Sequence, residues 1–498
     1  MKQLIHNGIL FPKYEPRGFK ITAQRNLVAL TPQQEEMAVA WVKKLGTEYV
    51  EDPVFVRNFF GDFCKALRLD RNLGSEDFDF SEIVRYVERE KAKRLSMSKD
   101  EKKRLAAERK AVREANREKY GRAIVDGEKV DLGNYMAEPS CIFMGRGKHP
   151  LRGKWKQGPS EADVVLNLSP HAPRPPGNWK EIVWQPDFMW VAKWDDKLGG
   201  EEKYVWLADS SSVKQERDIE KYDRAIALDR KIGELRAHIS ANLAASDLKR
   251  RKIATVAYLI DTLKLRVGDE KDRDEADTVG ATTLRPEHIK IRDDGRVMFD
   301  FLGKDSVRWC KEVELPPPVV DNFREFMTDA RSSIFQGVRS DNMKDFLSEV
   351  VPDLSAKVFR TYHASKVVDE YLKTAKVSKE DPDYVKKSVA AFANLEAAIV
   401  CNHKRKLPKN WENSLAKKIE RLKVLKTKRT RKSAEAVKAL KLKIRTMKAT
   451  RDYNLGTSLK SYIDPRLYYR WGKRVDFDWK LYYPKTLQRK FSWIEKNP

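Results

Sequence analysis

KNWENSLAKKIERLKVLKTKRTRKSAEAVKALKLKIRTMK, residues 409–448, carries the strongest structural pattern in the chain. Apolar residues recur there at spacings of three and four in two runs, Leu415 to Leu425 and Val437 to Met447. This spacing places each run on one face of a helix, and the basic stretch from Thr427 to Ser433 interrupts it. The segment therefore predicts two helices folded back on one another as an antiparallel coiled-coil arm.

Positive charge gathers in the same part of the chain. Residues 404–451 hold 19 Lys and Arg against three Glu, whereas all 498 residues together hold 100 basic and 74 acidic side chains, a net charge of +26. An excess of this size favours a polyanionic partner, most simply nucleic acid. Because the arm has little apolar surface of its own, we expect it to be mobile.

The sequence before the arm predicts helices and a hairpin. An apolar stripe from Ile253 to Leu263 lies within the helical stretch 214–266 and stops near Gly268. RVMFDFLGKDSVRWCKEVEL, residues 296–315, alternates in the manner of a β-hairpin with its turn at Gly303 to Ser306. Helices are expected again over 319–403.

The remaining segments differ in composition. Residues 88–120 are rich in Lys, Glu, Arg and Ala and predict one or two long solvated helices. Gly, Pro and Trp interrupt residues 141–210 at short intervals, which is typical of a β-rich segment, and two short strands are expected within EIVWQPDFMWVAKW (181–194). We expect a mainly α, multidomain α+β protein. Its predicted parts are a cap region (1–140), a β-rich core portion (141–195), a catalytic core (196–403), the basic linker (404–452) and a compact C-terminal domain (453–498).

Several classes of protein are excluded by what the sequence lacks. Its apolar runs are far shorter than the ~18 residues of a membrane span, and its N-terminus has no signal-peptide core. The four cysteines, Cys64, Cys141, Cys310 and Cys401, are scattered, which favours reduced thiols over a disulfide framework. Zinc-ligand spacings and the GxxxxGK[ST] phosphate loop are missing. The sequence predicts a soluble intracellular protein without a metal or nucleotide cofactor.

Basic and aromatic residues dominate the places where chemistry is expected, and phosphodiester transfer suits them. Uncatalysed phosphodiester cleavage is so slow that an enzyme must lower its barrier by about 20 kcal/mol. Arginine forks bind pairs of phosphate oxygens and keep their charge. A tyrosine can attack phosphorus. Ionising its phenol, with a pKa near 10, costs roughly 4 kcal/mol at pH 7, and adjacent arginines can reduce that cost. Lysine can protonate a leaving oxygen, and histidine can hold another.

Five short segments supply one such residue each: Arg266 in KLRVGDEKDRDEADTVG (264–280), Lys304 in FDFLGKDS (299–306), Arg360 in AKVFRTYHAS (356–365), His403 in CNHKR (401–405) and Tyr462 in GTSLKSYIDPR (456–466). Each residue alone has an ordinary structural explanation in packing, helix capping or ion pairing. In this order, and with FPKYEP (11–16), GRGKHP (145–150), KYVWLADSSSVK (203–214) and the arm between His403 and Tyr462, the chain resembles the eukaryotic-type (type IB) DNA topoisomerases essentially from end to end.

The resemblance implies roles for these residues. Tyr462 matches the nucleophile that forms a 3′-phosphotyrosyl bond, Arg266 and Arg360 a phosphate clamp, and His403 a further oxyanion donor. Lys304 matches the general acid. The DNA contacts implied are Arg146, Lys148, Lys304, Asp305 and Ser461. The resemblance also implies a bilobed clamp around duplex DNA with a catalytic domain like that of tyrosine recombinases, acting as a monomer on supercoiled DNA without ATP or metal.

Two departures from the family pattern stand out. Ser461 precedes the tyrosine where the eukaryotic enzymes usually carry Asn, which puts sensitivity to camptothecin-type poisons in doubt. The long charged N-terminal extension of the eukaryotic enzymes is missing, which suggests a compact archaeal homologue at the nucleoid; a eukaryotic chain would act in the nucleus.

Two other functions stay open at this point. A tyrosine recombinase or integrase shares the phosphotyrosine chemistry, but it normally has His-x-x-Arg where this chain has Lys357-Val-Phe-Arg360. A non-catalytic DNA clamp would explain the charge alone.

Overall fold

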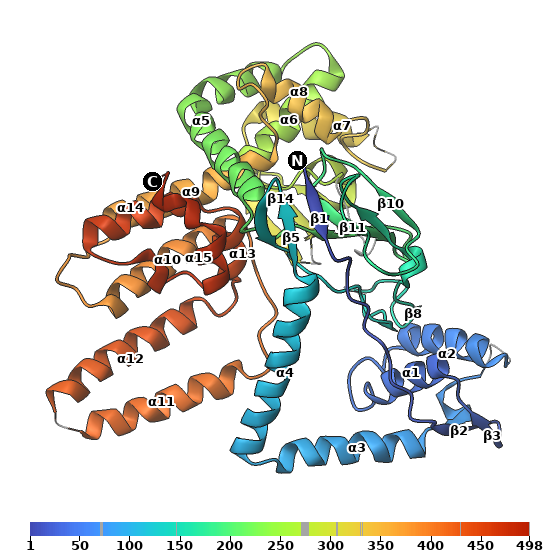
Figure 1. The fold of residues 1–498 in the computed structure, drawn as a ribbon. Coiled ribbons are helices and arrows are strands. Elements are labelled where there is room, and N and C mark those ends of the chain that lie inside the picture. Colours follow the sequence, from blue (N-terminus) through green and yellow to red (C-terminus); the bar gives the residue numbers. More distant parts are fainter. Residues whose placement is uncertain are drawn as a thin grey trace. The chain divides into compact units, whose positions relative to one another are not determined.

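The computed structural model describes residues 1–69, 73–145, 147–269, 278–304, 307–328, 330, 332–428 and 430–497. The described residues form two compact units that divide after Lys214: residues 1–214 make up the first unit and the residues from Gln215 onward the second. Both units mix helices with small sheets (Figure 1), which confirms the expected multidomain α+β class. The division into five parts stays a prediction.

The first unit begins with a small aromatic core. Helices α1 (Pro32–Val42) and α2 (Pro53–Leu67) pack with a three-stranded sheet. Its strands are β2 (Lys20–Ala23), β3 (Asn26–Ala29) and β4 (Phe78–Asp79), and the 3-10 helix η1 (Ser75–Asp77) directly precedes β4. Phe55, Phe59 and Phe63 lie on one face of α2 because they are spaced four apart, and all three are fully buried. Asp52 caps α2 by accepting hydrogen bonds from Val54 N and Phe55 N.

Two charged helices follow, α3 (Ser81–Ser96) and α4 (Lys99–Tyr120). No residue of α4 is buried, and Ser98 and Glu101 form a capping box at its start. The prediction of long solvated helices over 88–120 is therefore confirmed.

The rest of the first unit is β-rich, which confirms the prediction for residues 141–210. Strands β1 (Leu4–His6), β5 (Arg122–Val125) and β6 (Glu128–Asp131) form one sheet, and β7 (Cys141–Ile142) pairs with β8 (Trp155–Lys156). After the 3-10 helix η2 (Glu161–Asp163), strands β9 (Val165–Asn167), β10 (Glu181–Val183), β11 (Trp190–Asp195) and β12 (Glu202–Trp206) form a sheet in the order β10-β9-β11-β12. The two strands expected in 181–194 exist, but β9 lies between them, so they do not pair with each other.

The second unit starts with α5 (Ser212–Asn242), whose first residues belong to the first unit, and α6 (Leu248–Leu263). The predicted stripe of α6 is buried, and the helix ends at Lys264 in a left-handed conformation, before Gly268. The 3-10 helices η3 (Ala281–Thr283) and η4 (Pro286–His288) precede the sheet of β13 (Ile289–Ile291), β14 (Val297–Gly303) and β15 (Val307–Val313). Strands β14 and β15 pair from Val297↔Val313 to Gly303↔Val307, which confirms the hairpin.

Helices complete the second unit: α7 (Pro317–Thr328), α8 (Ser340–Ser348), α9 (Lys357–Thr374), α10 (Asp383–Val400), α13 (Leu455–Ser461), α14 (Pro465–Val475) and α15 (Lys485–Lys490), with 3-10 helices η6 (Trp479–Leu481) and η7 (Ser492–Glu495). The aromatic tail is a core, as expected. Tyr468, Trp471, Tyr483 and Phe491 are buried together with residues of α9 and α10.

The arm consists of α11 (Trp411–Thr427) and α12 (Arg431–Ala449), which run antiparallel (Figure 1). Leu440 and Ile444 on α12 are buried, whereas no residue of α11 is. Helix α12 also contacts α10: the Ser388 and Thr446 hydroxyls lie 2.9 Å apart, and Tyr384 donates to Glu435 at 2.6 Å. The antiparallel hairpin is confirmed, and its mobility stays a prediction.

Two findings concern the exclusions made from the sequence. All four cysteines are free thiols. Within the described ranges, every helix is too short or too polar to cross a membrane.

Candidate functional site

A cavity of about 130 Å³ in the second unit gathers four of the predicted residues. Arg266, Lys304, Arg360 and His403 all line it, with Lys264 and Lys404 beside them. No Asp or Glu is found among the described residues that line it. Its volume equals that of about four water molecules, which is the scale of one phosphate group. The cavity therefore suits an anion.

The segment 278–283 positions Arg266 and Lys304. The Val279 amide donates to Leu302 O at 2.7 Å on strand β14, two residues before Lys304. On its other side the Ala281 amide donates to Arg266 O at 2.8 Å. These bonds join the end of α6 to the tip of the β-hairpin.

Two glycines make this junction possible. Gly268 has a φ of +117°, and a Cβ added there would lie 2.7 Å from the Cα of Gly280. A Cβ on Gly280 would lie 2.4 Å from the Cα of Gly268. The two backbones thus meet at a distance that no side chain tolerates, which explains the glycine at the end of ADTVG.

Arg360 ties the ends of two helices together. It is buried on α9, and its guanidinium donates to Lys264 O and Cys401 O, each at 2.7 Å. Its Nη2 lies 3.2 Å from Nε2 of His403. Its Nε is buried and has no hydrogen-bond partner among the described residues. Arg360 thus lines an anion-sized cavity with one donor still unused.

His403 follows α10 after Asn402, which takes a left-handed φ of 52° and turns the chain out of the helix. Burial, followed by the neighbouring Arg360 and Arg266, lowers the pKa of His403 to about 3. The imidazole is therefore neutral in the free protein near pH 7. Its carbonyl accepts from Asn454 N at 2.7 Å, and Lys404 forms a β-bridge with Tyr453, so His403 lies where the arm joins the core.

Tyr462 is the C-cap residue directly after helix α13 and is half-buried. Its ring centroid lies 5.2 Å from the Arg360 guanidinium carbon and 5.1 Å from the His403 ring centroid. Tyr462 does not itself line the cavity. Asn454, the residue before α13, and Thr457, in the first turn of that helix, do line it. The phenol is thus adjacent to two of the cavity's four predicted side chains.

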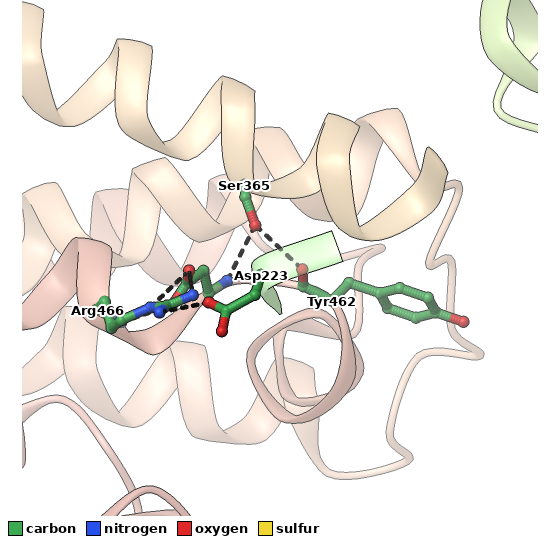
Figure 2. A network of polar contacts seen from close by, with 5 residues as sticks. Asp223, Ser365, Tyr462 and Arg466 are labelled. Atoms are coloured by element: carbon green, nitrogen blue, oxygen red, sulfur yellow. Dashed lines mark hydrogen bonds and ion pairs between the residues drawn. The ribbon is translucent and has the colours of Figure 1, made fainter. Parts of the chain in front are cut away.

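Helix α9 fixes the backbone of Tyr462. The Ser365 hydroxyl donates to Tyr462 O at 3.3 Å and accepts from Asp464 N at 3.0 Å. Asp464 caps α14 and binds Arg466, which also pairs with Asp223 at 2.8 Å. Figure 2 shows this network on one side of the Tyr462 backbone and the phenol pointing away from it. Because Ser365 and Arg360 share α9, one helix positions both the guanidinium and the tyrosine.

The remaining predicted DNA-contact residues either do not line the cavity or fall outside the described residues. Ser461 is the half-buried last residue of α13. Lys148 is exposed in the first unit, between β7 and β8. Arg146 and Asp305 lie outside the described residues. Among the described residues, no three His, Cys, Asp or Glu side chains gather in the manner of a metal site.

Sequence reasoning missed Lys264 and Ser458. Lys264 lines the cavity, and its pKa is lowered by burial and then by the nearby Arg236 and Lys311. It stands two residues before Arg266. Ser458 contacts His403 and precedes Tyr462 by four residues, one helical turn. This four-residue spacing could have predicted that Ser458 lies near the site. Serine occurs at many helix positions for purely structural reasons, however, so the spacing alone does not identify a site residue.

The depressed pKa of His403 predicts how stability depends on pH. Between the unfolded value of 6.5 and the folded value of about 3, the unfolded state binds one more proton at this residue. Its contribution to the free energy of unfolding is therefore complete above pH 6.5 and falls by about 1.4 kcal/mol per pH unit below it.

We expect His403→Gln to lose this slope between pH 6 and 4 in urea titrations of the full chain. The matched control is His171→Gln, because His171 is exposed in the first unit. An unchanged slope in His403→Gln would show that His403 is already protonated in the folded protein.

Three family models together match nearly the whole length of the chain. Residues 1–207 match the DNA binding fragment of eukaryotic DNA topoisomerase I, residues 210–436 match its catalytic core, and residues 434–498 match the C-terminal topoisomerase domain.

Curated relatives agree with these matches. DNA topoisomerase 1 beta of Arabidopsis thaliana is 37% identical over 99% of the chain, which covers 58% of that relative's length. DNA topoisomerase I, mitochondrial, of Rattus norvegicus is 34% identical, and the chain covers 90% of its length. Human DNA topoisomerase 1 is 32% identical, and the chain covers 70% of its length. The chain therefore belongs to the eukaryotic DNA topoisomerase I family.

Proposed function

We propose that this chain is a type IB DNA topoisomerase that relaxes supercoiled duplex DNA by nicking one strand, letting it rotate and resealing it. The cavity lined by Arg266, Lys304, Arg360 and His403, with the Tyr462 ring beside it, carries the proposal. A group of fixed cations around an anion-sized space is what a pentacoordinate phosphorane-like transition state requires. The family membership supports the same function.

The chemistry follows from the side chains. The Tyr462 oxygen attacks the phosphorus, its proton leaves to water, and the bond from phosphorus to the 5′-oxygen breaks. Lys304 gives a proton to that oxygen, so the leaving group departs as a neutral alcohol. Arg266 and Arg360 bind the non-bridging oxygens, and His403 binds one of them through a ring N–H.

Religation is the reverse reaction. The free 5′-hydroxyl attacks the 3′-phosphotyrosine, Lys304 takes back the proton of that hydroxyl, and the bond from phosphorus to the Tyr462 oxygen breaks, after which the phenolate takes a proton from water. One phosphodiester is exchanged for another, so the bond energy is conserved and ATP has no role in the balance. Strand rotation takes place between these two steps, and torsion in the duplex drives it.

The partners are part of the proposal. Duplex DNA, preferably supercoiled, is the substrate, and the chain acts on it as a monomer. The basic arm and exposed Lys148 suit sequence-tolerant contacts to the phosphate backbone. DNA contact by Arg146, Asp305 and Ser461, and closure of the two units around DNA as a clamp, remain proposals that rest on the family resemblance. The relatives named above are eukaryotic, and the rat relative is named as mitochondrial, which favours action in a DNA-containing compartment of a eukaryotic cell over an archaeal nucleoid.

A plasmid assay tests the function. We expect the purified chain to relax negatively supercoiled plasmid in EDTA and without nucleotide. Quenching with SDS is expected to trap protein on the 3′ end of the nick, which strands labelled at either end will distinguish. Supercoils that persist in this buffer would contradict the proposal. Exchange between two plasmids that share a site would favour a recombinase.

A further inference from the structure

A buried serine lies on the far side of His403 from Arg360. Ser458 on α13 is fully buried, and its Oγ is 2.7 Å from Nδ1 of His403. The carbonyl of the same serine accepts from Tyr462 N at 3.0 Å. One residue therefore contacts the histidine with its side chain and the tyrosine with its backbone.

The opposite edge of the imidazole determines the tautomer in the free protein. Nε2 faces Nη2 of Arg360 at 3.2 Å, and a guanidinium only donates hydrogen bonds. Nε2 must therefore accept there. Since the ring is neutral, its proton is on Nδ1, and this N–H donates to Ser458 Oγ.

The proposed reaction needs the opposite arrangement. Phosphate oxygens only accept hydrogen bonds, so His403 contributes to their binding only when Nε2 carries a proton. Nδ1 then becomes an acceptor and needs a donor. A serine hydroxyl serves in either direction because its hydrogen rotates about the Cβ–Oγ bond.

We propose that Ser458 is a positioning residue that lets His403 exchange tautomers, with Nδ1–H in the free protein and Nε2–H when a DNA phosphate occupies the cavity. In the exchange, Nδ1 releases one proton to water and Nε2 takes one from water, so the ring stays neutral and the net proton count is unchanged. Arg360 turns its Nη2 donor from Nε2 to the phosphate at the same time. This inference rests on the proposed function, which supplies the phosphate.

Histidine nitrogen NMR reads the tautomer directly. The full chain with ¹⁵N-labelled histidine gives the His403 signal, which His403→Gln assigns by its loss. We expect Nδ1 to be protonated in the free protein and Nε2 in Tyr462→Phe protein bound to a duplex oligonucleotide. Protonation of Nε2 in the free protein, of both nitrogens in the complex, or of the same nitrogen in both states would overturn the inference.

A double-mutant cycle tests whether Ser458 acts through His403. We expect Ser458→Ala to slow single-turnover DNA cleavage 10- to 100-fold, with the Kd for DNA changed less than threefold. In a His403→Gln background the same substitution should change the rate less than twofold. Ser458→Thr keeps a hydroxyl and should recover most of the rate. Ser388→Ala, which removes another buried and hydrogen-bonded serine hydroxyl, should behave as wild type.

The outcomes separate this inference from the proposed function. A wild-type chain that cleaves no DNA removes the proposed function itself. If the wild type cleaves, a Ser458→Ala rate equal to that of wild type overturns the inference. An equal loss from Ser458→Ala in both backgrounds overturns it too, because a purely structural role would slow both alike.

Discussion

Tyr462→Phe protein should bind duplex DNA with wild-type affinity and salt dependence, yet relax no supercoiled plasmid and form no SDS-stable complex. The substitution removes one oxygen, and with it the nucleophile of the proposed cleavage step. The ring stays, so its contacts with Arg360 and His403 persist. The backbone anchors to Ser365 and Ser458 do not involve the phenol and should also persist.

Relaxation and covalent trapping measure this effect, and a salt titration of DNA binding measures what remains. Affinity that falls linearly with the logarithm of salt concentration would report retained phosphate contacts. The matched control is Tyr469→Phe, since Tyr469 is also half-buried against the same aromatic core. It should relax DNA as wild type does. Residual covalent complex in Tyr462→Phe would mean that another residue attacks the phosphorus.

Arg360→Lys should slow single-turnover cleavage by about 10²- to 10³-fold, which corresponds to 3–4 kcal/mol of lost transition-state stabilisation. Lysine keeps the charge, but it cannot serve Lys264 O, Cys401 O and a phosphate at once as the planar guanidinium can. The Kd for DNA should change less than threefold because the other cavity cations and the arm remain.

Arg474→Lys is the control for this substitution. Arg474 also donates to a main-chain carbonyl, that of Leu372, but it does not line the cavity. Its cleavage rate should equal that of wild type. Thermal unfolding of both variants checks that the second unit stays folded. A cleavage rate within threefold of wild type in folded Arg360→Lys would contradict the role of phosphate clamp.

Local patterns predicted most of the secondary structure. The spacing of Leu440 and Ile444 predicted a buried seam in the arm, and the alternation in 296–315 predicted the hairpin. Both succeed because side-chain direction repeats every 3.6 residues in a helix and every two in a strand. The order of strands in the sheet was not predictable in this way, because β9, from an earlier segment, lies between β10 and β11.

The candidate site was predictable in residue type but not in physical state. Five segments in family order indicated which residues to watch, yet nothing in CNHKR reveals that His403 is neutral. Its pKa follows from burial and from guanidinium groups carried by other elements. The contribution of Lys264 and Ser458 was equally hidden, since neither belongs to a pattern that distinguishes a site residue from an ordinary one.

The sequence by itself determined the basic arm, the helices and hairpin, and the order of the chemical groups along the chain. Each of these depends on neighbours within a few residues. Only the tertiary structure decided that Arg266, Lys304, Arg360 and His403 share one cavity, that the Tyr462 ring lies beside two of them, and that Nε2 of His403 faces the Arg360 guanidinium. Burial and hydrogen bonding set those properties, and both arise from contacts between segments that are far apart in sequence.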